Sequence, residues 1–338
     1  MDQIQDQNTK ACTDAGSSDA SRRRFLKLAA ATGVALPLTT SMATAKGPVG
    51  VKTTRTKSTR PQLRPPFWEI EAARVMQSFT DGSTIPFHRY RALGSTAVAG
   101  TVPVLTGTAG DVVQLRVRNT LPYPVRPKIV GFNPGPSIAP GSTSAFDVVV
   151  PPEGTWLLTD DTLGDAAGPM GLGAVIVSRS QSALRKVSNY DREFVLLYVD
   201  SDDRWNAAID NGQVPNYALY EPNYHTVNNL TYPGTASDPG TTINCQLGDR
   251  ILLRMCNLGW MRHSIHFHGY HVDMERINNQ PQSIYGPKDT VPLPGHTTME
   301  ALLTIDQPGA FPFHPHSLTA TTDNGLYAGG QISLIVAT

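Results

Sequence analysis

Two short histidine motifs constrain this chain more than any other feature of its sequence. His266 and His268 form one H-x-H motif, and His314 and His316 form another. On a β-strand the side chains alternate between the two faces, so both imidazoles of such a motif lie on one face, ~6.5 Å apart. Most of the nine histidines of the chain fall in or beside these two stretches. We therefore predict that the histidines bind a metal, with copper or zinc as the natural ion for imidazole ligands.

The composition favours an all-β protein. A chain of 338 residues is long enough for one to three domains with real cores. It contains 29 glycines and 27 prolines, and only 17% of its residues are charged. Short alternating segments separated by turn residues are typical of Greek-key β-sandwiches. The formal net charge is zero and no basic stripe is present, so we expect no nucleic-acid partner.

The first 45 residues have the pattern of a twin-arginine signal peptide. The segment Ser21–Lys27 reads S-R-R-R-F-L-K, an apolar run from Leu28 to about Thr40 follows, and Ala43-Thr44-Ala45 supplies a cleavage pattern. The apolar run is too short and too weak for a stable membrane span. We expect export of the folded protein through the twin-arginine pathway, to the periplasm or outside the cell. Residues 46–66 read as a flexible lead-in to the mature protein.

One sequence frame occurs twice in the remaining chain. In the first copy Gly110-Asp111 precedes Asn119-Thr120-Leu121, and in the second copy Gly248-Asp249 precedes Asn257-Leu258. A repeat of this kind indicates two related domains in tandem. We place the first domain at residues 67–180 and the second at 181–338.

These segments resemble the multicopper oxidase superfamily. In the second domain, the stretch from His263 to Gly269, the K-D-T-V segment at Lys288 and the H-P-H segment at His314 are similar to the family motifs H-P-x-H-x-H-G, K-D-T-V and H-C-H. The resemblance implies two tandem cupredoxin-like Greek-key β-sandwich domains and copper as the cofactor.

The same resemblance shows where this sequence departs from the family. The first-domain motifs H-W-H-G and H-S-H correspond to Lys128-Ile129-Val130-Gly131 and Thr159-Asp160-Asp161. Pro315 stands where the family has the cysteine of the blue type 1 copper, and the two further type 1 positions fall at about Ala320 and Leu326. The resemblance therefore implies a degenerate member without a type 1 copper, in which ordinary laccase activity is not expected.

The candidate site follows from what remains. We expect His266, His268, His314 and His316 to bind the metal, and the resemblance adds His263, the one type 1 ligand position that is kept. Asp161 is the candidate catalytic residue, as a ligand, a water-orienting group or a general base, and the alternative is a turn aspartate that faces solvent. Two-domain relatives assemble as rings of three, so the resemblance also implies a homotrimer in which Asp161 of a neighbour faces the histidines.

Three functions stay open on the sequence. The first is a copper-dependent enzyme, redox or hydrolytic, that acts on an unknown small molecule. The second is a non-catalytic scaffold that resembles the twin-arginine-exported cell-division member of the superfamily, and the third is a copper-binding or delivery protein. Cys245 and Cys256 either form a disulfide or are small buried residues, and Cys12 lies in the predicted signal peptide.

Overall fold

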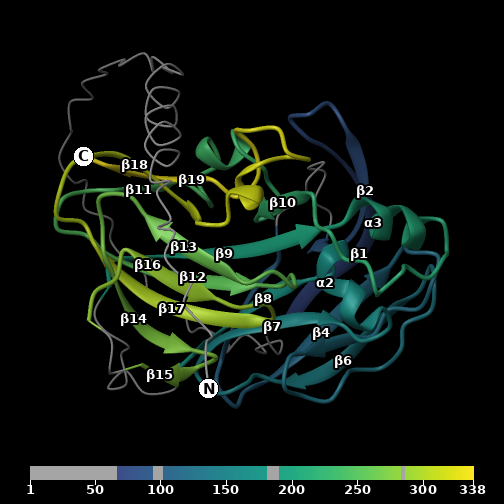
Figure 1. Cartoon of the computed structure of the whole chain (residues 1–338). Helices are drawn as coiled ribbons and strands as arrows, with labels where there is room; N and C mark the ends of the chain where they lie inside the picture. Colours follow the sequence, from purple (N-terminus) through teal and green to yellow (C-terminus); the bar gives the residue numbers. More distant parts are fainter. Residues whose placement is uncertain (1–66, 94–101, 181–189, 283–285) are drawn as a thin grey trace, which may run out of the picture. The chain divides into compact units, whose positions relative to one another are not determined.

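β-strands are the main regular structure of the described part of the chain, and its helices are short (Figure 1). The computed structural model describes residues 67–93, 102–180, 190–282 and 286–338, so the predicted signal peptide, the lead-in and Cys12 lie outside the described residues. The helices are α2 (Ala167–Met170), α3 (Asp203–Asp210) and the 3-10 turns η1 (Gly164–Ala166), η2 (Gly234–Ala236) and η3 (Leu318–Thr321). Within the described ranges, no helix is long and apolar enough to cross a membrane.

The first half of the described chain forms two sheets. Their strands are β1 (Phe67–Ser78), β2 (Thr84–Ala92), β3 (Val104–Thr108), β4 (Val112–Asn119), β5 (Pro127–Ile129), β6 (Thr143–Val149), β7 (Gly154–Asp160) and β8 (Ala174–Arg179). One sheet has the order β2-β1-β4-β6 and the other the order β3-β8-β7-β5. Alternating apolar residues from both sheets, such as Leu115 on β4 and Ile176 on β8, pack into one core.

The second half forms another two sheets. Their strands are β9 (Arg192–Ser201), β10 (Tyr224–Val227), β11 (Ile243–Cys245), β12 (Arg250–Asn257), β13 (His263–Phe267), β14 (Val272–Ile277), β15 (Gln280–Pro281), β16 (Thr290–Leu293), β17 (Thr297–Thr304), β18 (Gly309–Pro315) and β19 (Ser333–Ala337). The sheet orders are β10-β9-β12-β17-β14-β15 and β11-β19-β18-β13-β16. Leu253 on β12 and Phe313 on β18 belong to the shared core.

The second half repeats the topology of the first. The parallel pair β1–β4 corresponds to β9–β12, and the parallel pair β3–β8 corresponds to β11–β19. The antiparallel pair β5–β7 corresponds to β13–β18. The predicted fold class, all-β with two cupredoxin-like sandwiches in tandem, is confirmed. The residue numbers that we assign to the domain boundaries stay predictions.

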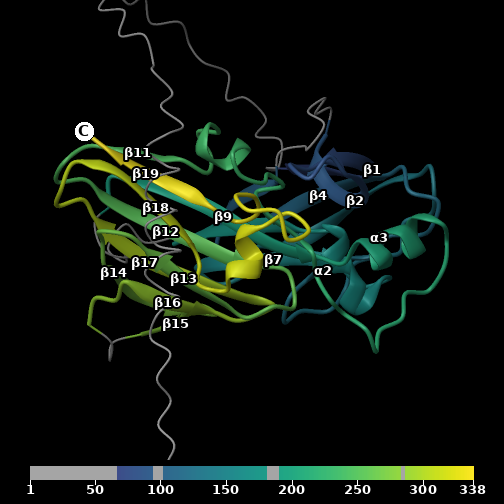
Figure 2. The same ribbon diagram turned by 45° about the horizontal axis from the view of Figure 1, so that its top comes forward.

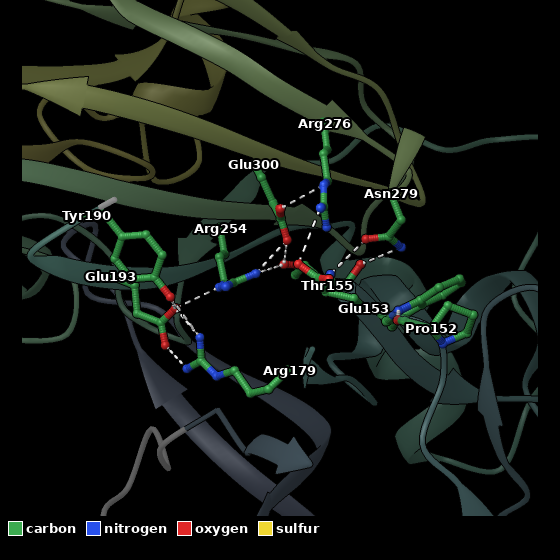
Figure 3. A network of polar contacts seen from close by, with 11 residues as sticks. Pro152, Glu153, Thr155, Arg179, Tyr190, Glu193, Arg254, Arg276, Asn279 and Glu300 are labelled. Carbon is green, nitrogen blue, oxygen red and sulfur yellow. Dashed lines mark hydrogen bonds and ion pairs between the residues drawn. The ribbon is translucent and has the colours of Figure 1, made fainter. Parts of the chain in front are cut away.

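A network of charged and polar side chains joins the two halves (Figure 3). Arg254 on β12 donates to Glu193 and to Glu300, and also, over 2.8 Å, to Oγ1 of Thr155 on β7. Asn279 closes the network from the side, because its amide both donates to and accepts from the Thr155 backbone. Arg254 and Glu300 are almost fully buried, and such a pair is tolerated because each has a second oppositely charged partner, Glu193 for Arg254 and Arg276 for Glu300.

The two cysteines in the described part of the chain are not paired with each other. Cys245 and Cys256 are both free and both buried. Of the two possibilities that the sequence left open, the disulfide is therefore wrong. Cys256 lies within β12 and packs beside Val199 and Leu258 as a small apolar side chain.

Candidate metal centre

The four histidines of the two H-x-H motifs lie together on one face of the β13–β18 pair. The strands are antiparallel, and His266 stands directly opposite His314. His268 and His316 follow the ends of the two strands, and backbone hydrogen bonds from His268 to Pro312 and from His316 to Ser264 continue the ladder. The ring of His266 lies 4.8 Å from that of His268, 6.2 Å from that of His314 and 5.2 Å from that of His316, measured between centroids.

Hydrogen bonds fix the protonated nitrogen of two of these rings. Nδ1 of His266 lies 3.1 Å from the backbone oxygen of Asp289 and 2.9 Å from Oγ1 of Thr290. Because a carbonyl oxygen only accepts, Nδ1 carries the proton and Nε2 is the basic nitrogen. In the same way, Nδ1 of His314 donates to the backbone oxygen of Pro315 over 2.8 Å. Partners of this kind set the tautomer of metal-ligating histidines.

His268 and His314 approach each other through their Nε2 atoms, which are 3.1 Å apart. Two nitrogen ligands of one tetrahedral ion, each at about 2.0–2.1 Å from it, lie roughly 3.3 Å from each other, so the observed separation suits a shared ion. Burial lowers the pKa of the His314 imidazole below its ordinary value, and the neighbouring His266 and His316 lower it further. His314 is therefore neutral near pH 7, which is the form that binds a metal.

The imidazoles do not yet form a finished coordination shell. Within residues 67–93, 102–180, 190–282 and 286–338, no three His, Cys, Asp or Glu side chains are already arranged to hold a metal ion. His316 is exposed, so its ring can turn about χ2 without disturbing the core, whereas two hydrogen bonds hold the half-buried His266 ring. Four imidazoles that could contribute nitrogen ligands thus lie together.

His263 does not join the four. It lies three residues before His266, and an odd spacing on a strand puts two side chains on opposite faces. The ring of His263 is completely buried, with its Nε2 3.6 Å from Oδ1 of Asp200 on β9. Our sequence-based set of five metal residues therefore divides into four clustered histidines and one core histidine.

Asp161 is paired with cations. Its Oδ1 accepts a 2.8 Å hydrogen bond from Nζ of Lys128, and Arg126 lies 3.5 Å from its Oδ2. The hydrogen bond from Lys128 holds the pKa of the Asp161 carboxyl below its ordinary value. A carboxylate stabilised in this way is a weaker base, which argues against the predicted role as general base.

Sequence reasoning missed the supports of the cluster. Asp289 and Thr290 belong to the K-D-T-V segment that we recognised by resemblance, but the resemblance assigned them no contact. Their position follows from the pairing of β13 with β16, which sets His266 opposite Thr290. The K-D-T-V motif was visible in the sequence, but only the register of β13 and β16 shows that its Asp289 and Thr290 contact His266.

The comparisons with known proteins agree with this geometry. Residues 206–331 match the profile of the multicopper oxidase family. A segment of 82 residues is 34% identical to an iron transport multicopper oxidase of Epichloe festucae (strain E2368), and it covers 23% of this chain and only 12% of that protein. Among solved structures, the blue copper oxidase from Nitrosomonas europaea matches with a TM-score of 0.70 at 20% identity, over 81% of this chain and 86% of that chain.

A nitrite reductase has the same fold. The copper nitrite reductase from Nitrosomonas europaea matches with a TM-score of 0.63 at 16% identity, over 81% of this chain and 94% of that one. At such identities the structural likeness shows the fold alone, and the sequence match of residues 206–331 adds the family. The described chain therefore has the fold of these copper proteins, and its residues 206–331 match the multicopper oxidase family.

Proposed function

We propose that this protein is an exported copper protein that holds one copper ion with His266, His268, His314 and His316. The single observation that carries the proposal is the pairing of the two H-x-H motifs, with His266 opposite His314 and two Nε2 atoms 3.1 Å apart. Imidazole nitrogens are good ligands for copper and also for zinc, the less favoured ion.

The chain contributes positioning to the proposed chemistry. The backbone oxygen of Asp289 and the hydroxyl of Thr290 hold the His266 ring, and the backbone oxygen of Pro315 holds the His314 ring. A copper ion bound there would supply single-electron chemistry without the blue centre, whose cysteine position is Pro315. We propose an oxidoreductase that acts on a small molecule, since His316 at the rim of the cluster is exposed to solvent.

One observation favours a second candidate function, a non-catalytic scaffold. An ion pair between Lys128 and Asp161 stands at the positions that correspond to copper histidines in first domains of the family. A protein that had ceased to use copper would be expected to lose such ligands. The four histidines on β13 and β18 argue for the copper protein, because a scaffold has no need of them.

Export and assembly are further parts of the proposal. The S-R-R-R-F-L-K segment supports twin-arginine transport to the periplasm or the exterior, and replacing Arg22 and Arg23 by lysine would retain the protein in the cytoplasm. The resemblance to two-domain relatives supports a homotrimer. Light scattering on the purified protein tests it, and a monomeric mass would contradict it.

The test of the copper site is a double substitution with a matched control. His266→Ala combined with His316→Ala removes one half-buried and one exposed ligand of the proposed site, and we expect copper content to fall to background. His271→Ala removes an exposed histidine outside the two motifs and should leave copper content unchanged. Elemental analysis of protein with a native circular dichroism spectrum measures both. Equal copper in all three proteins would overturn the proposal.

A further inference from the structure

Four aromatic rings form a contiguous cluster around helix α3. Trp205 on α3 is at its centre, with ring centroids 5.1 Å from Tyr217, 4.7 Å from Tyr220 and 5.1 Å from Trp260. Tyr220 and Trp260 are also neighbours, at 5.0 Å. The short helices α2 and α3 lie side by side at this end of the molecule (Figures 1 and 2).

The rings of the cluster differ in exposure. Tyr217 is 45% exposed, Tyr220 and Trp260 are half-buried, and Trp205 between them is only 1% exposed. The Trp205 indole is held by a 2.8 Å hydrogen bond to the backbone oxygen of Leu219. Three rings therefore form a row in space, in the order Tyr217, Trp205 and Tyr220, and Tyr217 at one end is exposed to solvent.

A buried carboxylate stands at the inner end of this row. The Tyr220 hydroxyl donates to the carboxylate of Asp200, which is fully buried. The backbone N–H groups of Trp260 and Met261 also donate to Asp200, at 3.0 and 3.1 Å. Burial alone would raise the pKa of Asp200, but these contacts and His263 outweigh it and lower the pKa, so the group is ionised.

Packing alone does not account for this arrangement. An apolar cluster is stabilised by burial of its rings, and a buried ionised carboxylate beside it costs free energy. Burial and the charge of Asp200 raise the pKa of Tyr220, so the phenol does not ionise by itself. A phenol that donates to a carboxylate has, however, a ready acceptor for its proton when it loses an electron.

We propose that Tyr217, Trp205, Tyr220 and Trp260 form a single-electron path from the surface to Tyr220, with Asp200 as the proton acceptor. When Tyr220 gives one electron through the row to an outer-sphere one-electron oxidant, a metal complex at the surface near Tyr217, its O–H bond breaks and the proton moves to the Asp200 carboxylate. The products are a neutral tyrosyl radical, a neutral carboxylic acid and a one-electron-reduced oxidant, so charge and atoms balance. The path uses this chain's own side chains and goes beyond the copper proposal.

The path ends at Asp200, beside the first residue of strand β13, which carries the first histidine motif. Asp200 contacts His263 at the start of β13, and His266 follows three residues later, ~10 Å along the strand. The fold thus connects a solvent-exposed tyrosine with the strand of the candidate metal centre by a route that contains no cysteine.

The experiment uses the metal-free full chain and photogenerated tris(bipyridine)ruthenium(III) as the one-electron oxidant. We expect a tyrosyl radical by electron paramagnetic resonance, with slower formation in D2O because a proton moves with the electron. Tyr220→Phe removes only the hydroxyl, and the tyrosyl signal should fall several-fold. Trp205→Phe interrupts the row, and the rate of radical formation should also fall several-fold.

The matched control is Tyr90→Phe. Tyr90 is also buried and donates to a buried carboxylate, Asp160, over 2.9 Å, but it lies in the first-half core. Its removal should leave the radical unchanged. A radical of equal yield and lifetime in Tyr220→Phe, or an unchanged rate in D2O, would overturn the proposal. Because no metal is present, either result leaves the copper proposal untouched.

Discussion

The strand pair β5–β7 in the first half and the strand pair β13–β18 in the second half have the same geometry and different side chains. Lys128 lies opposite Thr159 in the first pair, as His266 lies opposite His314 in the second. Asp161 corresponds in turn to His316. Where the second half has four imidazoles, the first half has a half-buried ion pair between Lys128 and Asp161, so the strand pair forms without the histidines.

The frame around each pair is the same because it is buried. Asn119 donates to the backbone oxygens of Tyr123 and Ile138, and Asn257 donates to those of Met261 and Leu293. Both amides are fully buried, and both accept from the backbone N–H two residues later. The comparison teaches that the buried asparagine supports the fold, while the outward positions of the strand pair are open to change.

The largest expected effect concerns this frame. Asn119→Ala and Asn257→Ala each remove two donated hydrogen bonds and leave buried backbone groups unsatisfied, so each should cost about 3 kcal/mol of unfolding free energy. Urea unfolding measures the two costs. Asn211→Ala, at an exposed helix end, is the control and should change little. A small loss of unfolding free energy at only one of the two asparagines would show that the two halves do not depend on this residue in the same way.

A smaller effect separates two corresponding histidines. His88 pairs with Arg74 across β1–β2, and His225 pairs with Asp200 across β9–β10. Burial lowers the pKa of His225 to about 4, so the unfolded chain takes up a proton below about pH 6.5 that the folded chain refuses. Stability therefore falls as the pH drops from about 6.5 to about 4, by about 2 kcal/mol between pH 7 and pH 5.

The test compares two variants. His225→Gln should remove this acid loss. Burial also lowers the pKa of His88, but the hydrogen bond and charge of Asp210 oppose the shift, so His88→Gln should relieve less. Urea midpoints at pH 7 and pH 5 measure both. A greater relief from His88→Gln would contradict the assignment.

The smallest effect concerns the ion pair itself. Lys128→Met removes the hydrogen bond that lowers the pKa of Asp161, so that pKa should move up towards its ordinary value, as carboxyl NMR would show. Stability should change little, because both side chains are partly exposed to solvent at the surface. Copper content should not change, and Lys128→Arg, which keeps the cation, is the control. A loss of copper in Lys128→Met would place the first half in the site.

Much of the fold could be predicted because its signals are local. The repeated Gly-Asp and Asn-Leu frame gave two related sandwiches, and H-x-H alternation placed His266 with His268 and His314 with His316. The motifs also predicted that Lys128 and Asp161 stand at positions that correspond to histidines of the family. The register of β5–β7 matches that of β13–β18, so Lys128 corresponds to His266.

The rest depends on contacts between distant segments. The resemblance grouped His263 with the other histidines, yet the parity of β13 turns it towards Asp200, more than sixty residues earlier. No local sequence pattern predicts that Asp161 forms an ion pair with Lys128, or that the Tyr220 hydroxyl donates to the buried carboxylate of Asp200. Such pairings are set by strand register and packing, which a single sequence does not encode in its periodicity.

The central claim is that the second half binds one copper ion and the first half none. Metal analysis of the purified chain, with an electron paramagnetic resonance spectrum of the copper-loaded form, tests it most directly. We predict one copper per chain, with a type 2 signal and no blue absorption. Refusal of both copper and zinc would make the histidines structural and favour the scaffold function, and a blue colour or several coppers per chain would contradict the assignment of Pro315 and Lys128.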